Sequence, residues 1–564
     1  MAEFRWGADP GVALRLVVAA VVLVAAAVAL RSTRSILDAR VLFAAGAALA
    51  AFVVAALLGA TPALSLMGRF PRYEGLGMLL LYVGLAAAGA VAIGGGQRVQ
   101  QALLALAGLQ LVLVAQASWE TLHGGARVVT SVGNASDLAV VGLTGFGVLL
   151  WHALEHRYAW LWAGAGAAAL VVVLSGSRGG WLGLVTILAA AVVLLAAARR
   201  WRAVAWLGGL LLAAAAVVVA VPVTRARLLG EGLASQTAGG RLLMWRETLS
   251  LVGARPATGA GPSRFVDEIG AVQSEQWAQM IGPENPPDSP HNAILQVMAS
   301  TGILGTVAVL AAVAVVVVLL WRARSDWARA CLLASLGAGV ALCFHFTTLW
   351  ALGPLLLCVG GALAAPARRT WPWTVALVAV AAWAGVVGIL TTTAEGRLAD
   401  DIERMAAGEP GSEERLVATL SSKSWDPDFV RRGAYAVVSL AEQGDADPAP
   451  VLPALTEACA RLPRSTECAQ TLGNAQLLSG RPDDAVRTLE GALSYAPTNS
   501  DTWLWLADAQ AVAGDLEAAV DSLARVTELR LDDPTAWDAL AVAYERMGEP
   551  GLSAAARAEA DARR

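Results

Sequence analysis

Residues 292–321 read NAILQVMASTGILGTVAVLAAVAVVVVLLW, a run of 30 residues without a charged side chain. A bilayer core about 30 Å thick is crossed by about 20 apolar residues in a helix, because lipid offers the backbone no partner outside that helix. The run is therefore long enough to span a membrane. Hydrophobic residues make up 57% of the 564-residue chain and charged residues 15%, which excludes a disordered protein and an ordinary soluble enzyme.

On both sides of this run, further apolar stretches reach or nearly reach the length of a membrane span. A secretory signal peptide is the alternative for the first of them, but a run of about 20 apolar residues without a convincing cleavage site is too long for the usual signal. We interpret it as a retained span. The twelve predicted spans cover residues 11–31, 40–60, 76–94, 99–117, 137–152, 158–175, 180–198, 203–222, 292–321, 327–347, 350–366 and 371–391.

The arginines are distributed unevenly between the two sides of the predicted membrane. The loops after the odd-numbered spans hold 13 Arg, whereas the opposite short segments hold six. Short loops rich in Arg and Lys stay in the cytoplasm. The bias therefore predicts that the long loop 223–291 and the C-terminal tail lie outside the cytoplasm. Because the arginines form short clusters between apolar runs, nothing indicates a nucleic-acid-binding surface.

Charge and periodicity separate the tail from the membrane part. Residues up to 391 contain 25 Arg and 15 acidic side chains, and residues from 392 onward contain 16 Lys and Arg against 30 acidic side chains. We expect an all-α protein with a polytopic membrane domain at 1–391, a helical connector or degenerate repeats at 392–464, and repeats at 465–564. Pairs of like residues recur 34 positions apart in the tail, namely Trp503 and Trp537, Leu506 and Leu540, and Ala507 and Ala541.

A period of 34 residues is typical of tetratricopeptide repeats, which are antiparallel helix pairs that stack into an α-solenoid. We count two full repeats and a truncated third. Such solenoids bind peptides or proteins along a concave face, so a protein partner on the tail is one prediction. A stabilising cap on the membrane domain is the alternative. Cys459 and Cys468 lie near the facing ends of two predicted helices and could form a disulfide if the tail is extracytoplasmic.

Charged groups near lipid are costly, so they are the informative candidates for chemistry. Ser177 and Arg178 belong to the segment SGSRGG, which interrupts two apolar spans on the outer side. A tight glycine-rich turn exposes backbone N–H groups beside the guanidinium, and this arrangement favours the binding of an anion. An arginine that merely reaches the membrane interface is the alternative, although it leaves the serines and glycines unexplained.

His291 is the one histidine of the outer loop, and it immediately precedes the long apolar run. Its unperturbed pKa near 6.5 suits it to accept a proton from a hydroxyl. Capping the helix or anchoring the loop is the alternative. Arg69, Arg72 and Glu74 lie in another outer loop and are candidates for a second anion site or for an interfacial salt bridge. We interpret His345 as an interfacial or helix-packing residue.

The sequence contains neither a ligand spacing suited to zinc nor a glycine-rich phosphate loop with its lysine. We therefore expect no metal, no cofactor and no ATP-driven mechanism. A transporter or flippase is a rival interpretation of twelve spans. A transporter would need charged residues near the middle of the bilayer, and its two halves often have similar sequences. The predicted spans show neither feature. A non-catalytic scaffold for the repeat tail is a third possibility.

Several short motifs follow one another between about residues 60 and 350. They are Ser65-Leu-Met-Gly68 with Arg72 and Glu74-Gly75, Gly133-Asn134, Ser177-Arg178-Gly179, Gly240-Arg241 with Trp245, Arg255-Pro256 with Gly259 and Gly261, and His291-Asn292 with Leu295-Gln296 and Gly302-Ile-Leu-Gly305. Taken in this order, the motifs resemble the O-antigen ligase and polymerase superfamily. Many relatives are similar in carrying a C-terminal tetratricopeptide tail. One departure is Ser300-Thr301 before Gly302, where relatives often have an acidic residue.

The resemblance implies a multi-pass glycosyltransferase of the GT-C type in the bacterial inner (cytoplasmic) membrane. Such an enzyme moves a glycan from a polyprenyl diphosphate carrier to a hydroxyl acceptor outside the cytoplasm, without a metal and with inversion. Arg178 and Arg241 would neutralise the diphosphate, Arg264 would be a third candidate, and His291 would be the base. The acceptor is a lipid or protein for a ligase, and another lipid-linked glycan for a polymerase.

Overall fold

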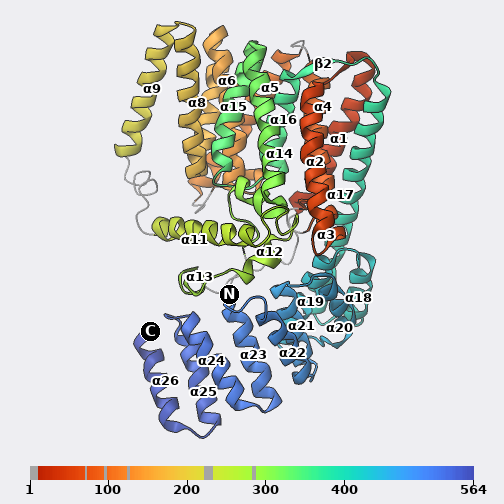
Figure 1. Ribbon diagram of the computed structural model, residues 1–564, viewed down its shortest axis with the longest axis vertical. Coiled ribbons are helices and arrows are strands. Elements are labelled where there is room, and N and C mark those ends of the chain that lie inside the picture. The colour runs from red at the N-terminus through yellow and green to blue at the C-terminus, as the bar shows by residue number, and fades with distance from the viewer. Residues whose placement is uncertain (1–9, 70–72, 95–97, 124–127, 221–232, 282–286) are drawn as a thin grey trace.

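The computed structural model describes residues 10–69, 73–94, 98–123, 128–220, 233–281 and 287–564 (Figure 1). Each of the twelve predicted stretches contains one helix, and these helices stand side by side as a bundle. Their bounds are α1 Pro10–Thr33, α2 Ala39–Leu58, α4 Leu76–Ile93, α5 Val99–Leu122, α6 Ala135–His156, α7 Ala159–Ser175, α8 Arg178–Ala197, α9 Trp201–Ala220, α14 Ala293–Ala323, α15 Asp326–Leu342, α16 Leu349–Ala362 and α17 Trp371–Ala406.

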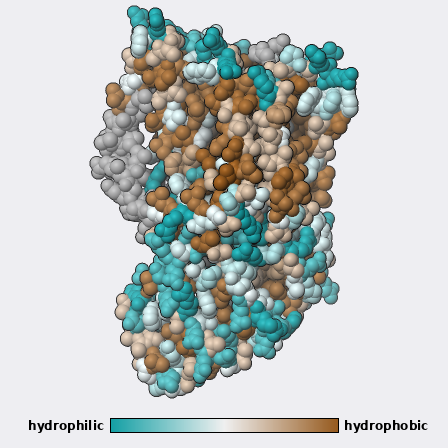
Figure 2. Space-filling model, in the orientation of Figure 1, coloured by the Kyte–Doolittle hydropathy of each residue, from teal (hydrophilic) through white to brown (hydrophobic). Residues whose placement is uncertain are grey.

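Eight of these helices, within the described residues, are long and apolar enough to cross a membrane. Helices α7, α15 and α16 are shorter, with 17, 17 and 14 residues. The outer surface of the bundle agrees with a membrane location, because it exposes large apolar side chains. Phe43 and Trp206, for example, are each 81% exposed. Figure 2 shows apolar side chains over the middle of the bundle and hydrophilic ones at its ends and over the tail.

Helix α6 is the centre of the bundle. Its membrane-spanning window is wholly buried, whereas the other long spans present much of their surface outward. Leu143, Leu149 and Trp151 of α6 belong to one large apolar core with residues of α7, α8, α15 and α16. The side chain of Asn134 caps the helix by accepting a hydrogen bond from the N–H of Ser136.

The two ends of the bundle differ. At the end away from the tail, β1 (Ser35–Leu37) pairs antiparallel with β2 (Ala364–Pro366), which brings the connections after α1 and α16 together (Figure 1). At the other end lie the short elements of the outer segments. Their bounds are α3 Pro62–Met67, η2 Thr130–Val132, α11 Leu233–Ala254, α12 Phe265–Glu268, η3 Ile269–Ala271 and α13 Glu275–Ile281.

Helix α14 is broken at Gly302, where the loop after α11 enters it. Gly302 has φ 65° and ψ −167°, a backbone conformation essentially confined to glycine. The N–H of Ile303 donates to the carbonyl of Pro256 at 2.8 Å, and the carbonyl of Ala299 accepts from Ala260 at 2.7 Å. The loop therefore supplies the partners that the broken helix lacks, as membrane proteins require.

The tail is a row of helices that continues directly from α17 (Figure 1). Helix α17 runs through residue 391, the expected end of the membrane domain, without interruption. The third repeat, expected to be truncated, consists of two full helices, α25 and α26. The elements of the tail are α18 Ser412–Ser422, α19 Pro427–Ala441, η4 Ala449–Val451, α20 Leu452–Arg461, α21 Thr466–Leu478, α22 Pro482–Leu493, α23 Ser500–Ala513, α24 Leu516–Leu529, α25 Pro534–Arg546 and α26 Pro550–Arg563.

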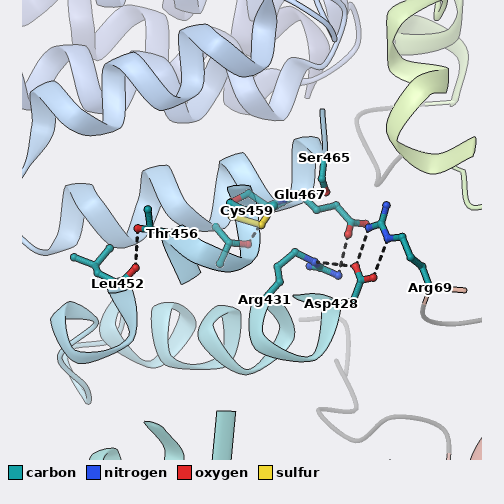
Figure 3. The surroundings of a disulfide bond; sticks show 10 residues. Arg69, Asp428, Arg431, Leu452, Thr456, Cys459, Ser465 and Glu467 are labelled. Atoms are coloured by element: carbon teal, nitrogen blue, oxygen red, sulfur yellow. Dashed lines mark hydrogen bonds and ion pairs between the residues drawn. A yellow bond between two sulfur atoms is a disulfide. The ribbon is translucent and has the colours of Figure 1, made fainter. Parts of the chain in front are cut away.

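A disulfide joins Cys459 of α20 to Cys468 of α21 (Figure 3). Their Cα atoms are 5.5 Å apart, a separation that suits the bond. The structure therefore agrees with the pairing considered from the sequence. Cys331, Cys343 and Cys358 are free.

We expect Gly302→Ala to lower the midpoint of thermal unfolding of the detergent-solubilised protein. A side chain at this φ and ψ costs about 1–3 kcal/mol, and a Cβ would also overlap the carbonyl group of Ala257. Gly408→Ala is the matched control, because Gly408 has φ +69° but nothing within 4 Å of an added Cβ. Equal losses in the two variants would show that the closeness of the loop to α14 is unimportant. Tryptophan fluorescence provides the measurement.

Candidate functional site

Arg178 is the first residue of α8, at the bundle end that faces the tail. Ser177 caps this helix, since its hydroxyl accepts a hydrogen bond from the N–H of Gly180 at 3.2 Å. Gly179 packs against the segment between α15 and α16, where a Cβ on Gly179 would lie 3.2 Å from Cβ of Phe344. The glycines thus let the start of α8 approach Phe344 closely, and Arg178 is partly exposed beside this contact.

Arg241 lies on α11, the helix that crosses the same end of the bundle (Figure 1). Trp245 is one turn further along and therefore on the same face of the helix. The ring of Trp245 lies 6.1 Å from that of Phe344, measured between centroids. Its indole N–H donates to the carbonyl of Pro290 at 2.9 Å. This face of α11 thus touches both the Phe344 segment and the residue before His291.

His291 adopts φ 48°, a left-handed backbone conformation that is uncommon for a side chain of its size. Its N–H donates to Oγ of Ser289 at 3.2 Å. The next residue, Asn292, caps α14 by accepting hydrogen bonds from Ile294 and Leu295 at 3.0 and 3.1 Å. The His291 ring lies 5.5 Å from that of Phe346. These hydrogen bonds fix the backbone around His291, and its ring lies near the segment between α15 and α16.

These contacts bring the segments that carry three predicted site residues to one place. The start of α8, with Arg178, and the α11 face, with Arg241, both meet Phe344, and His291 meets Phe346. The turn at residues 344–346 is thus their common neighbour, although Arg178 and Arg241 are 63 positions apart in the sequence and Arg241 and His291 are 50 apart. Their convergence at one end of the bundle is what a site for a single substrate requires.

Glu74 lies near the start of α14. Nε2 of Gln296 donates to its carboxylate at 2.9 Å, and the hydroxyl of Ser263 donates to its backbone carbonyl at 3.3 Å. Gln296 follows His291 by about one turn. The structure therefore places Glu74 beside the His291 helix. Arg72, predicted to bind substrate, lies outside the described residues.

Arg69, a candidate for a second anion site or a salt bridge, and Arg264, the third candidate for the diphosphate, are both buried in an ionic network; for Arg69 this agrees with the salt-bridge alternative. Arg69 is 6% exposed and Arg264 is 0% exposed. Arg69 donates two hydrogen bonds to Asp428 of the tail, at 2.9 and 2.8 Å (Figure 3). It also pairs with Asp267. Arg264 pairs with the same Asp267 at 2.8 Å and with Glu268 at 3.0 Å.

This network joins three parts of the chain, namely the α3–α4 loop, α12 and the tail. Arg464 of the tail reaches Glu268 at 2.8 Å. Burial opposes ionisation of the Asp428 carboxyl, but the Arg69 guanidinium outweighs it, so the pKa of Asp428 lies below its usual value. Burial raises the pKa of Asp267 against the opposing effect of Arg69 and Arg264. We infer that these arginines hold the tail against the outer loop.

Two buried carboxylates at this end of the bundle were missed by the sequence analysis. Nε2 of His345 lies 2.7 Å from Oδ1 of Asp137, so the histidine predicted to be a packing residue has an acidic partner. Glu247 of α11 accepts from the N–H and the hydroxyl of Ser274, at 2.9 and 2.7 Å. Burial raises the pKa of Glu247. The sequence offers one signal for Asp137, since a charged residue at the start of an apolar stretch needs a partner. It offers no such signal for Glu247.

Within the described residues, no group of three or more His, Cys, Asp and Glu side chains is placed to hold a metal ion.

We expect Arg69→Met to destabilise the protein by about 3–5 kcal/mol, because it leaves Asp267 and Asp428 buried without their shared cation. Arg557→Ala is the control, since the Arg557–Glu545 pair is exposed and such pairs contribute about 0–1 kcal/mol. Thermal unfolding and limited proteolysis of the tail provide the measurement. Wild-type stability together with a loss of donor binding would restore the original substrate-binding assignment of Arg69.

Comparison with known proteins identifies two segments of the chain. Residues 163–310 match the family described as O-antigen ligase, and residues 477–543 match the tetratricopeptide repeat. None of the curated proteins compared with the chain is significantly similar to it. Among solved structures, "MamA MSR-1 C2" is 20% identical and aligns over 29% of this chain and 92% of its own, with a TM-score of 0.23. "Crystal structure of MamA" is 14% identical over 28% and 92%, with a TM-score of 0.25.

The ligase match contains Arg178, Arg241 and His291, and the repeat match lies in the tail. Both confirm the resemblance predicted from the motifs. The chain is therefore a membrane protein whose segment 163–310 matches the O-antigen ligase family and whose tail matches the tetratricopeptide repeat at 477–543.

Proposed function

We propose that the protein is an O-antigen ligase-like glycosyltransferase of the bacterial inner membrane. It takes a glycan from a polyprenyl diphosphate carrier and joins it to a hydroxyl of an acceptor on the extracytoplasmic side. The observation that carries the proposal is the convergence on residues 344–346 of the Arg178, Arg241 and His291 segments, all three of which lie in the matched ligase segment 163–310. The substrate class comes from the family, and the roles of the residues come from their chemistry.

The reaction is a single displacement at the anomeric carbon. The acceptor oxygen forms a bond to that carbon while the bond to the diphosphate oxygen breaks, so the configuration inverts. The hydroxyl proton passes to the imidazole of His291, a role for which its pKa range is suited. The diphosphate leaves with additional negative charge, and the guanidinium groups of Arg178 and Arg241 neutralise it by hydrogen bonds. No cofactor takes part in this scheme.

Polymerisation is the alternative, in which the acceptor is a second lipid-linked glycan. The tail favours ligation, since a row of helical repeats offers a surface for a protein acceptor or for a partner that delivers one.

We expect Arg178→Ala, Arg241→Ala and His291→Asn each to reduce glycan transfer by about 100-fold or more, given typical effects of removing a base or a charge-stabilising group. Asparagine is chosen at position 291 because it tolerates a left-handed backbone. Arg246→Ala is the control on the same helix and Arg202→Ala is the control near the start of α9, since both side chains are exposed. The measurement uses the purified full chain, a polyprenyl diphosphate glycan and a non-prenyl acceptor.

Wild-type transfer in folded Arg178→Ala and Arg241→Ala variants would contradict the catalytic assignment and favour a scaffold. The same assay separates the two acceptor classes. Product on the non-prenyl acceptor supports ligation, whereas formation of only longer prenyl-linked chains supports polymerisation.

The orientation of the tail is a separate part of the proposal. The arginine bias supports a tail outside the cytoplasm, and the Cys459–Cys468 disulfide is compatible with an oxidising compartment.

In intact cells, we expect a membrane-impermeant maleimide to label the tail only after treatment with a reductant that does not cross the membrane. Cys459→Ser/Cys468→Ser is the control and should remain unlabelled at the tail. Labelling that requires permeabilised membranes would place the tail in the cytoplasm.

A further inference from the structure

Asp137 and His345 form a buried acid–histidine pair next to the proposed transfer site. Asp137 lies in the first turn of α6, the most buried helix of the bundle, and is 2% exposed. His345 lies between α15 and α16 and is 4% exposed. Its Nε2 is 2.7 Å from Oδ1 of Asp137. Burying such groups is unfavourable unless they are paired, and paired polar groups inside membrane proteins commonly mark functional positions.

The pair fixes the turn that the site residues share. The rings of His345 and Phe346 are 4.1 Å apart between centroids, and Phe346 is the ring that neighbours His291. On the other side of His345, Phe344 packs against Gly179 and Trp245. Any shift of the His345 ring therefore moves the surface on which the proposed base and both diphosphate-binding helices rest.

We propose that Asp137 and His345 are a positioning pair for glycan transfer, in which the Asp137 carboxylate accepts the Nε2–H of His345 and so fixes the turn 344–346. This inference rests on the proposed function. Neither residue touches substrate in this scheme. They act by holding Phe344 and Phe346 in place. These two rings in turn set the positions of Arg178, Arg241 and His291 relative to one another.

Variants that keep or remove the hydrogen bond test this role. Asp137→Asn retains an acceptor oxygen, and His345→Gln retains an N–H donor close to the position of Nε2. Asp137→Ala and His345→Ala remove the bond. We expect the first two to retain kcat within about 10-fold, and the second two to lose about 100-fold, a typical result of misplacing a catalytic group by about 1 Å. The KM for the acceptor should change less than kcat.

His152 provides the matched control for the loss of a buried histidine. It is 2% exposed, lies toward the opposite end of the same helix, and bonds through Nδ1 to the carbonyl of Val148 at 2.9 Å. We expect His152→Ala to lower the thermal midpoint about as much as His345→Ala while keeping kcat within about 2-fold of wild type, because it lies about 20 Å along the helix from Asp137. If both variants lowered kcat equally, the pair would be merely structural.

Coupling provides a second check. Since the two residues act through one bond, Asp137→Ala/His345→Ala should lose no more activity than either single variant. Additive losses would overturn the proposal. If the alanine variants do not fold, His345→Asn replaces them, because its shorter side chain cannot reach Asp137, and its kcat should fall well below that of His345→Gln. Equal kcat values in these two variants would also overturn the proposal.

The two proposals fail in distinguishable ways. A folded wild-type chain that transfers no glycan to any acceptor overturns the proposed function, and the positioning role with it. A wild-type chain that transfers glycan, with Asp137→Ala and His345→Ala as active as His152→Ala, overturns only the positioning role.

Discussion

Lipid cannot hydrogen-bond a peptide group, and the rest of the structure depends on this constraint. Twelve helices satisfy their own backbones, and their outer surface carries side chains such as Phe43 and Trp206. The constraint is most visible where a helix is interrupted. At Gly302 of α14, the loop at Pro256 and Ala260 supplies both a donor and an acceptor to the exposed backbone. An irregular backbone at this place is stable only because the outer loop is built into the helix.

Charged groups follow the same constraint and collect at the end of the bundle that faces the tail. There Arg69, Arg264, Asp267 and Asp428 bring three segments of the chain into one buried network. Removing any one charge leaves its partners buried, and this cost makes such networks sensitive to single substitutions. The tail is thus fastened to the same loop that completes α14. In this structure the tail packs on the outer loop, which is compatible with its repeats also binding a partner.

The sequence was sufficient to predict the parts of the structure that local patterns determine. Each predicted apolar stretch contains a helix, because a backbone in lipid must satisfy its own hydrogen bonds. The 34-residue period predicted the helices of the repeats. The roles of single arginines were not predictable in this way. Arg69 and Arg178 look alike in the sequence, since each lies in a glycine-containing outer segment. Only the fold brings Asp428, 359 positions away, onto Arg69. The Asp137–His345 pair was missed for the same reason.

The distinction between the two kinds of arginine bears directly on the proposed chemistry. A guanidinium that already neutralises two buried carboxylates gains little from a diphosphate, because the carboxylates would lose their partner when the ligand arrived. Arg69 meets this description, and Arg264 is likewise buried and paired with two carboxylates. Arg178 and Arg241 are partly exposed, one at a capped helix start and one on a helix that crosses the bundle end. A ligand at that end can therefore reach side chains that are not wholly buried. What the fold must still provide is their alignment with His291, and residues 344–346 contact the elements that carry all three.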